Sequence, residues 1–124
     1  MKGKRKTDQK TAIREVIGAS RRPLTAQEIL DEAQAIVPGI GIATVYRNVK
    51  SLVSSGWLRT VDLPAEPTRY ERHDLDHHHH FQCEDCGRVF DVPGSTGGVR
   101  DLLPAGFQLH HHEIVMYGLC AECN

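Results

Sequence analysis

Two pairs of cysteines are the residues of this chain whose spacing points most directly to chemistry. Each pair encloses two residues, in Cys83-Glu-Asp-Cys86 and in Cys120-Ala-Glu-Cys123. Such a pair can turn both sulfurs toward one ion, and two pairs supply the four thiolates of a closed tetrahedral zinc site. Two disulfides, or a redox-active Cys-x-x-Cys pair, are the alternatives. We predict a structural zinc on these four cysteines.

Histidines are concentrated in the same part of the chain. All eight lie within residues 73–112, and four of them form the run His77–His80. Alternate side chains of a strand point to opposite faces, so His78 and His80 would share one face and the other two histidines the opposite face. One tetrapeptide could then serve two metal sites. Imidazole binds zinc, iron, nickel, cobalt and copper, so the residue type alone does not select the ion.

Strands must bring the cysteine pairs together, because residues 87–119 separate them. The segments Val89–Val92 and Glu113–Tyr117 have the composition of strands, and the histidine run continues like a third strand into Phe81. Between them, residues 93–109 contain several glycines and prolines, so we expect a helix of only about two turns there.

The two halves of the chain carry opposite charges. Residues 1–72 hold 13 Lys and Arg against 8 Asp and Glu, whereas residues 73–124 hold 2 Arg, no Lys and 8 Asp and Glu. The overall net charge of −1 hides this difference. We predict a basic domain over residues 1–72 that could contact a polyanion, and a metal-binding domain over residues 73–124.

A winged helix is the predicted fold of the basic domain. Apolar spacing predicts three helices and then two strands, at Thr11–Ile17, 25–37, 43–55, 57–63 and 69–72. Thr25 and Glu28 have the spacing of a capping box, which begins the second helix. The second and third helices would form a helix-turn-helix, and the strands would form the wing.

The exposed face of the third helix has residue types that contact DNA. Arg47 can bridge a phosphate or a guanine edge, and Tyr46 can stack or contact a phosphate. Thr44 and Lys50 share this face, and Lys10 belongs to a basic N-terminal segment whose phosphate contacts would release counterions. We expect these five residues to bind DNA. A soluble three-helix domain without DNA affinity is the alternative.

Several classes of protein are disfavoured by what the sequence lacks. No apolar run is long enough for a membrane helix, and no apolar segment follows the basic residues Met1–Lys6, so we expect a cytoplasmic protein in a reducing compartment. A hydrolase would need an open-coordination metal and a positioned base, but no His-Glu-x-x-His or nucleophile motif is present, so we expect no enzyme activity. A metal-storage protein or metallochaperone is the alternative from another class, although it would give the recognition helix no role.

Three segments together resemble the ferric uptake regulator superfamily: Gly41–Arg47, His77–Gly87 and Tyr117–Cys123. The resemblance spans about Thr7 to Cys123 and is greatest to the zinc uptake regulator branch, because the histidine run is unbroken. It implies a homodimeric, metal-sensing repressor of metal-uptake genes that binds double-stranded operator DNA. It also implies an α+β fold, in which a winged helix precedes a small α/β dimerisation domain with a four-cysteine zinc.

The resemblance also assigns a regulatory metal to the hinge between the domains. Its implied ligands are two histidines, a residue of the strand leading in from the wing, and a carboxylate: His78, His80, Glu71 or His73, and Asp91. A second site in the dimerisation domain would use His77, His79 and His112. The glutamate that usually completes this second site would fall near Gly98. The histidine that many members place before the second helix is replaced by Arg22-Pro23.

The regulatory ion implied by the resemblance is a divalent metal, and we favour zinc. A histidine-rich tetrahedral site suits zinc, whereas adding Glu71 and Asp91 would favour five- or six-coordinate iron or manganese. Iron sensing, and manganese or peroxide sensing, are therefore the alternatives within the same superfamily.

Overall fold

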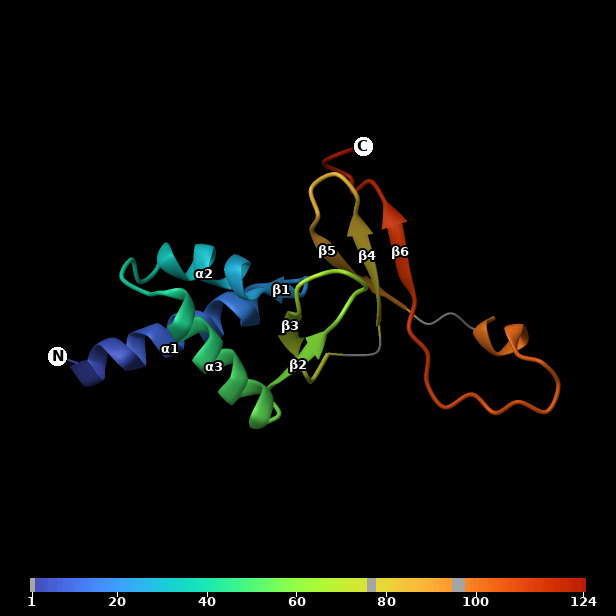
Figure 1. Cartoon of the computed structure of the whole chain (residues 1–124), viewed down its shortest axis with the longest axis horizontal. Coiled ribbons are helices and arrows are strands. Elements are labelled where there is room, and N and C mark those ends of the chain that lie inside the picture. The colour runs from blue at the N-terminus through green and yellow to red at the C-terminus, as the bar shows by residue number, and fades with distance from the viewer. Residues whose placement is uncertain (1, 76–77, 95–97) are drawn as a thin grey trace. The chain divides into compact units, whose positions relative to one another are not determined.

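The computed structural model describes residues 2–75, 78–94 and 98–124, and only the backbone of residues 2–7. The chain forms two compact units, Met1–Asp74 and Leu75–Asn124. Figure 1 labels the helices and strands of both units. In the described parts of the chain, no helix is both long enough and apolar enough to cross a membrane.

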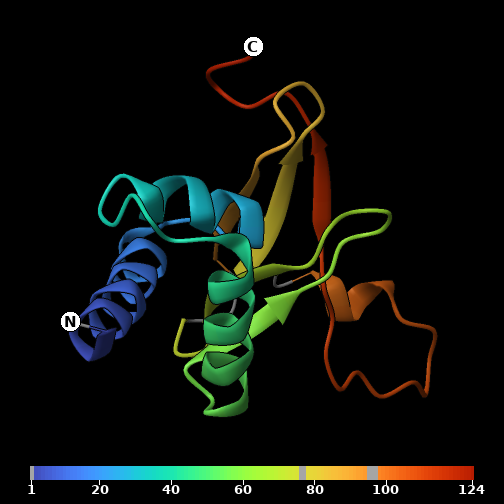
Figure 2. The same cartoon turned by 60° about the vertical axis from the view of Figure 1, so that its left-hand side comes forward.

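The N-terminal unit has the element order of a winged helix. Its helices and strands are α1 (Lys2–Ala19), β1 (Leu24–Thr25), α2 (Ala26–Gln34), α3 (Ile42–Ser54), β2 (Leu58–Val61) and β3 (Arg69–Arg72). The strands form an antiparallel sheet in the order β1-β3-β2, and α3 packs against β2 (Figure 2). The predicted helix-turn-helix and wing are thus confirmed.

Local sequence signals begin and end α2. The Thr25 Oγ1 accepts a hydrogen bond from the Glu28 backbone N–H at 3.1 Å, and Glu28 Oε1 accepts one from the Thr25 N–H at 2.9 Å. The predicted capping box is therefore present. The helix ends at Gln34 rather than at Val37, and the chain continues as a turn in which the Ile36 and Val37 N–H groups donate to the Ala33 carbonyl. Pro38 disfavours helical geometry at Val37. Ile36, which falls within the predicted helix 25–37, is 51% exposed.

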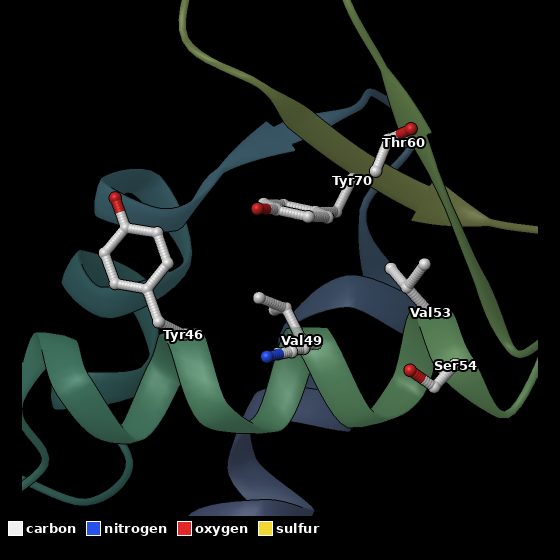
Figure 3. A pocket seen from close by; sticks show the side chains of 7 residues that line it. Tyr46, Val49, Val53, Ser54, Thr60 and Tyr70 are labelled. Atoms are coloured by element: carbon white, nitrogen blue, oxygen red, sulfur yellow. The ribbon is translucent and has the colours of Figure 1, made fainter.

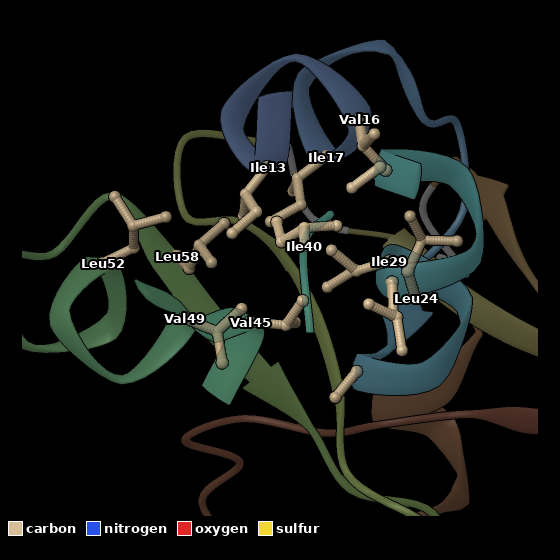
Figure 4. Close-up of a cluster of buried hydrophobic side chains, with 13 residues drawn as sticks. Ile13, Val16, Ile17, Leu24, Ile29, Ile40, Val45, Val49, Leu52 and Leu58 are labelled. Carbon is tan, nitrogen blue, oxygen red and sulfur yellow. The ribbon is translucent and has the colours of Figure 1, made fainter. Parts of the chain in front are cut away.

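One hydrophobic core holds the N-terminal unit together. Ile13 of α1, Ile29 of α2 and Val45 of α3 are fully buried in it, together with Leu58 of β2 (Figure 4). Burying a side chain of this size stabilises a fold by about 1.5–3 kcal/mol. Because all three helices and the wing contribute, α3 and β3 are held as parts of one body.

The C-terminal unit is a small sheet. It consists of β4 (His78–Cys83), β5 (Val89–Pro93), the 3₁₀ turn η1 (Val99–Leu102) and β6 (Val115–Gly118). The strand order is β5-β4-β6, with β5 antiparallel and β6 parallel to β4. The three predicted strands are confirmed. Within the described residues of segment 93–109, the predicted two-turn helix is present only as η1, which Leu103 ends in an extended conformation.

The core of the C-terminal unit is small. Among its described residues, the buried hydrophobic side chains are Cys83, Val89 and Cys120. A domain of this length with so little buried apolar surface needs a metal, disulfides or a partner chain to be stable. The buried cysteines therefore form a large part of the core of this unit.

Candidate metal centres and DNA-binding face

The sheet of the C-terminal unit brings the two cysteine pairs together. Cys83 is the last residue of β4, and the turn that follows it carries Cys86 and Gly87, whose φ of +76° suits glycine. In the parallel pairing of β4 with β6, Cys83 lies opposite Gly118, so the second pair begins two residues beyond this register. The Glu84 N–H donates to the Gly118 carbonyl at 2.7 Å. Strand pairing thus closes the long separation between the pairs, as predicted.

The four sulfurs have a spacing that fits one metal ion. The Sγ atoms of Cys83, Cys86, Cys120 and Cys123 all lie within 4.8 Å of one another. A tetrahedral zinc with Zn–S bonds of about 2.3 Å requires sulfurs about 3.8 Å apart. The Sγ atoms of Cys86 and Cys120 are 3.9 Å apart, and all four cysteines are free thiols without disulfides. The cluster therefore suits four-coordinate metal binding better than either predicted alternative.

Hydrogen bonds shift the pKa values of three of these thiols, and not all in the same direction. The backbone N–H groups of Cys120 and then Cys86 donate to the Cys83 sulfur, each at 3.4 Å, and lower its pKa to about 6. The Arg88 guanidinium lowers the pKa of Cys86. The hydrogen bond with Cys120 raises the pKa of Cys123. Because metals bind the thiolate form, the lowered pKa of Cys83 favours metal binding near neutral pH.

Two histidines and a carboxylate form a second donor set in the C-terminal unit. His78 and His80 lie on one face of β4, with ring centroids 4.9 Å apart. Asp91 lies opposite His80 in the β4–β5 pairing, and its Oδ1 is 3.3 Å from His78 Nε2 and 3.5 Å from His80 Nε2. The structure thus gathers three residues that the sequence analysis assigned to the regulatory site. Two imidazoles and one carboxylate leave further coordination positions open.

The two candidates for a wing-side ligand belong to the N-terminal unit and differ in burial. Glu71, on β3, is only 4% exposed, and its Oε1 accepts a hydrogen bond from Arg59 Nε at 2.9 Å. The side chain of His73 is exposed, while its backbone N–H donates to the Trp57 carbonyl at 3.0 Å. Arg59 had not been predicted to take part, and its place opposite Glu71 in the β2–β3 pairing gave no signal in the sequence.

The opposite face of β4 carries part of the predicted second site. His79 is 3% exposed, and its ring centroid is 5.3 Å from that of His112. His77, the third predicted ligand, lies outside the described residues. Among the described side chains, no group of three metal donors includes His79 and His112.

The exposed face of α3 carries the predicted DNA-contacting residues. Val45, Val49 and Leu52 of this helix are buried, whereas Tyr46, Arg47 and Lys50 are exposed. Thr44 is half-buried, and its hydroxyl accepts a hydrogen bond from Arg47 Nη2 at 3.1 Å. Lys10 is exposed on α1.

A shallow pocket of about 380 Å³ separates α3 from the wing. Figure 3 shows the Tyr46 ring on α3 and the Tyr70 ring on β3 at its edge, above Val49 and Val53. Lys50, Ser54 and Thr60 complete the lining. Helix and wing therefore form one continuous surface of aromatic, hydroxyl and basic groups.

Comparisons with known proteins agree with this architecture. The family model described as the ferric uptake regulator family matches residues 1–117. The peroxide operon regulator of Bacillus subtilis is 32% identical over 126 residues, covering 98% of this chain and 86% of its own. A solved structure described as a zinc-bound manganese uptake regulator has a TM-score of 0.79 at 24% identity, with 91% of this chain and 88% of that chain covered.

A zinc uptake regulator, FurB of M. tuberculosis, is also similar. Its structure matches at 31% identity with a TM-score of 0.56, covering 98% of this chain and 97% of its own. These similar proteins are named as regulators of a peroxide operon, of manganese uptake and of zinc uptake, and not as enzymes. With a family model that covers nearly its whole length, this chain belongs to the ferric uptake regulator family.

Proposed function

We propose that this chain is a metal-responsive repressor that acts in the cytoplasm as a homodimer and controls metal-uptake genes. The observation that carries the proposal is that one small unit holds two donor sets of different chemistry. Four cysteines form a closed set, and His78, His80 and Asp91 form an open one. A protein that must keep one metal and exchange another needs one closed donor set and one open donor set. The separate winged helix supplies the surface for DNA.

The four cysteines are proposed to hold a structural zinc. Four thiolates fill a tetrahedral shell and leave no position for an exchanging ligand. The small core of the unit supports a stabilising role, because Val89 is its one fully buried aliphatic side chain among the described residues. Metal binding would therefore contribute directly to folding.

The regulatory metal is proposed to bind between the two units. His78, His80 and Asp91 would supply ligands from the C-terminal unit, and Glu71 or His73 would supply one from the N-terminal unit. Burial supports Glu71, since a carboxylate that is 4% exposed requires positive charge nearby. Because β3 pairs with both β1 and β2, a ligand on β3 would constrain the whole winged helix.

Zinc is the proposed regulatory ion, and ferrous iron or manganese is the second candidate. The histidine pair suits zinc, but the approach of Asp91 to both imidazoles favours an ion that accepts carboxylates and more ligands. Peroxide sensing would accompany iron or manganese. His77, His79 and His112 are proposed as a second regulatory site, which the 5.3 Å separation of the His79 and His112 rings supports.

Metal binding would act by favouring one arrangement of the two units. In the favoured arrangement, the two recognition helices of a dimer would meet successive major grooves of a near-palindromic operator. Tyr46, Arg47, Lys50 and Thr44 would face the bases and phosphates, and Lys10 would add a phosphate contact. A coupling of this kind is typically about 1–3 kcal/mol. Loss of the metal would release the DNA.

Exposed apolar side chains support the proposed homodimer. Met116 and Tyr117 lie on β6, which is an edge strand, and are 39% and 52% exposed. Leu119 and Phe107 of the same unit are 52% and 67% exposed. Exposed apolar side chains on an edge strand are typical of an interface.

The His80→Ala variant tests this proposal. It should lose metal-dependent DNA binding, keep the metal of the four cysteines and remain a dimer, while the exposed His111→Ala serves as the matched control. Binding would be measured by fluorescence anisotropy on a duplex selected from a random library, over a range of salt concentrations. A regulator gives a steep log–log salt slope, whereas a metal-storage protein would show no DNA affinity. Metal-dependent binding of His80→Ala equal to that of the wild type would refute the regulatory site.

A further inference from the structure

One arginine of the C-terminal unit contacts a residue in each of the two segments that carry the cysteine pairs. This acidic unit contains two arginines, Arg88 and Arg100, and no lysine. The Nε of Arg88 donates to the Cys86 sulfur at 3.3 Å, and its Nη2 lies 2.6 Å from a carboxylate oxygen of Glu122. Glu122 belongs to the second cysteine pair, between Cys120 and Cys123. The guanidinium therefore bridges two turns that are 34 residues apart in the chain.

The conformation of Arg88 is held by its surroundings. Its backbone carbonyl accepts a hydrogen bond from the Cys83 N–H at 3.0 Å, which closes the β4–β5 turn. Its guanidinium carbon lies 5.6 Å from the centroid of the Phe90 ring, within the range of a cation–π interaction. The side chain is 32% exposed, so two-thirds of it is covered. These contacts aim the planar guanidinium at sulfur and carboxylate together.

The cysteine that Arg88 contacts is the most solvent-exposed of the four. Cys83 and Cys120 are buried and Cys123 is half-buried, but Cys86 is exposed. The Cys83 sulfur receives two backbone N–H groups, whereas the Cys86 sulfur receives the Arg88 guanidinium. A divalent ion with four thiolates has excess negative charge, which a cationic donor offsets. Access of a chelator or an oxidant to the cluster would begin at Cys86.

We propose that Arg88 is a positioning residue that shields the Cys86 thiolate of the metal-bound cluster and, through Glu122, adds a weaker link to the second cysteine pair. The inference rests on the metal proposed above for the four cysteines. Most of the effect belongs to the contact with sulfur, because Glu122 is 75% exposed and an ion pair so open to water contributes little. Arg88 thereby slows the release of a metal that the regulator must retain while the other site exchanges.

The rate of zinc transfer to a chromophoric chelator tests this role of Arg88 in the full-length chain. Arg88→Gln should release the zinc of the four cysteines about 10-fold faster, as substitutions beside metal ligands typically do. Glu122→Gln, which keeps the contact with sulfur, should change the rate by less than about 5-fold. Arg100→Gln removes the same charge from the same unit at an exposed position and should match the wild type. Arg88→Lys keeps the charge without the planar fork and should lie between the wild type and Arg88→Gln.

Cobalt substitution gives a readout that a loss of general stability would not reproduce. Removing the Arg88 hydrogen-bond donor leaves the Cys86 thiolate more electron-rich. The thiolate-to-cobalt charge-transfer band of Arg88→Gln should therefore shift to longer wavelength. Equal spectra and equal transfer rates in the wild type and Arg88→Gln would overturn the role of Arg88 alone. A wild-type chain whose four cysteines take up neither zinc nor cobalt would overturn both this role and the proposed structural site.

Discussion

Replacing Cys83 by serine should unfold the C-terminal unit and leave the N-terminal unit folded. Cys83 is 1% exposed, and its sulfur accepts hydrogen bonds from the backbones of both cysteine pairs. Serine keeps a hydrogen-bond acceptor but is a poor zinc ligand. The substitution therefore separates the loss of the metal from the loss of packing.

The free-energy contributions to each unit indicate which of them should unfold in Cys83→Ser. A structural zinc on four cysteines contributes about 10–16 kcal/mol of apparent binding free energy. Val89, the fully buried aliphatic residue of the described part of this unit, contributes about 2 kcal/mol. Without the metal, the small sheet cannot offset the conformational entropy of its chain. The N-terminal unit has its own core of 13 buried residues and does not depend on Cys83.

Hydrogen exchange followed by mass spectrometry would distinguish the two units. In Cys83→Ser, amide protection should be lost across residues 78–93 and kept across residues 42–61. His111→Ala, an exposed substitution in the same unit, should keep both. Full protection of β4 and β5 in a metal-free Cys83→Ser chain would show that packing alone holds the unit and would refute the reasoning.

Three further predictions concern the N-terminal unit. Burial raises the pKa of Glu28, but hydrogen bonds from the Thr25 backbone and Arg22 outweigh it and lower the pKa below 4.5. Because its folded pKa is lowered, Glu28 stabilises the fold above pH 4.5 and loses this effect as the pH falls toward the folded pKa. Glu28→Gln should therefore lower the free energy of unfolding in urea by about 1 kcal/mol at neutral pH, and by less in acid. Ile13→Ala, at a side chain that is 0% exposed, should destabilise the unit by about 2–5 kcal/mol, whereas the exposed Glu15→Ala should not. Lys50→Gln should weaken DNA binding alike on all sequences and lower the salt slope by about 1; an unchanged slope would exclude a phosphate contact.

The elements predicted best from the sequence are those that residue type and the spacing of apolar residues determine locally. The capping box at Thr25 and Glu28, the wing, and the strand that places His78 and His80 on one face all follow from local patterns. The grouping of the cysteines followed from the chemistry of thiolates, although spacing alone could not choose the parallel β4–β6 pairing that achieves it.

Features without such a pattern were missed. The strand β1 has only two residues, too few to show alternation, and its pairing with β3 depends on the tertiary fold. The helix α1 begins at Lys2, before the predicted start at Thr11. The prediction missed its first turns because they lack the apolar residues from which the helix was predicted. The contact of Arg88 with Cys86 has one local signal, an arginine two residues after a cysteine pair, but its bridge to Glu122 depends on the folded sheet.

The central claim is that a metal other than the one on the four cysteines controls DNA binding. The most direct measurement is the affinity of one preparation, with its cysteine-bound metal retained, for a selected duplex before and after mild chelation and after readdition of zinc, iron or manganese. The account predicts that metal per chain falls by one, that affinity falls by about 5–150-fold, and that one ion restores both. An affinity that stays constant while this metal leaves and returns would contradict it.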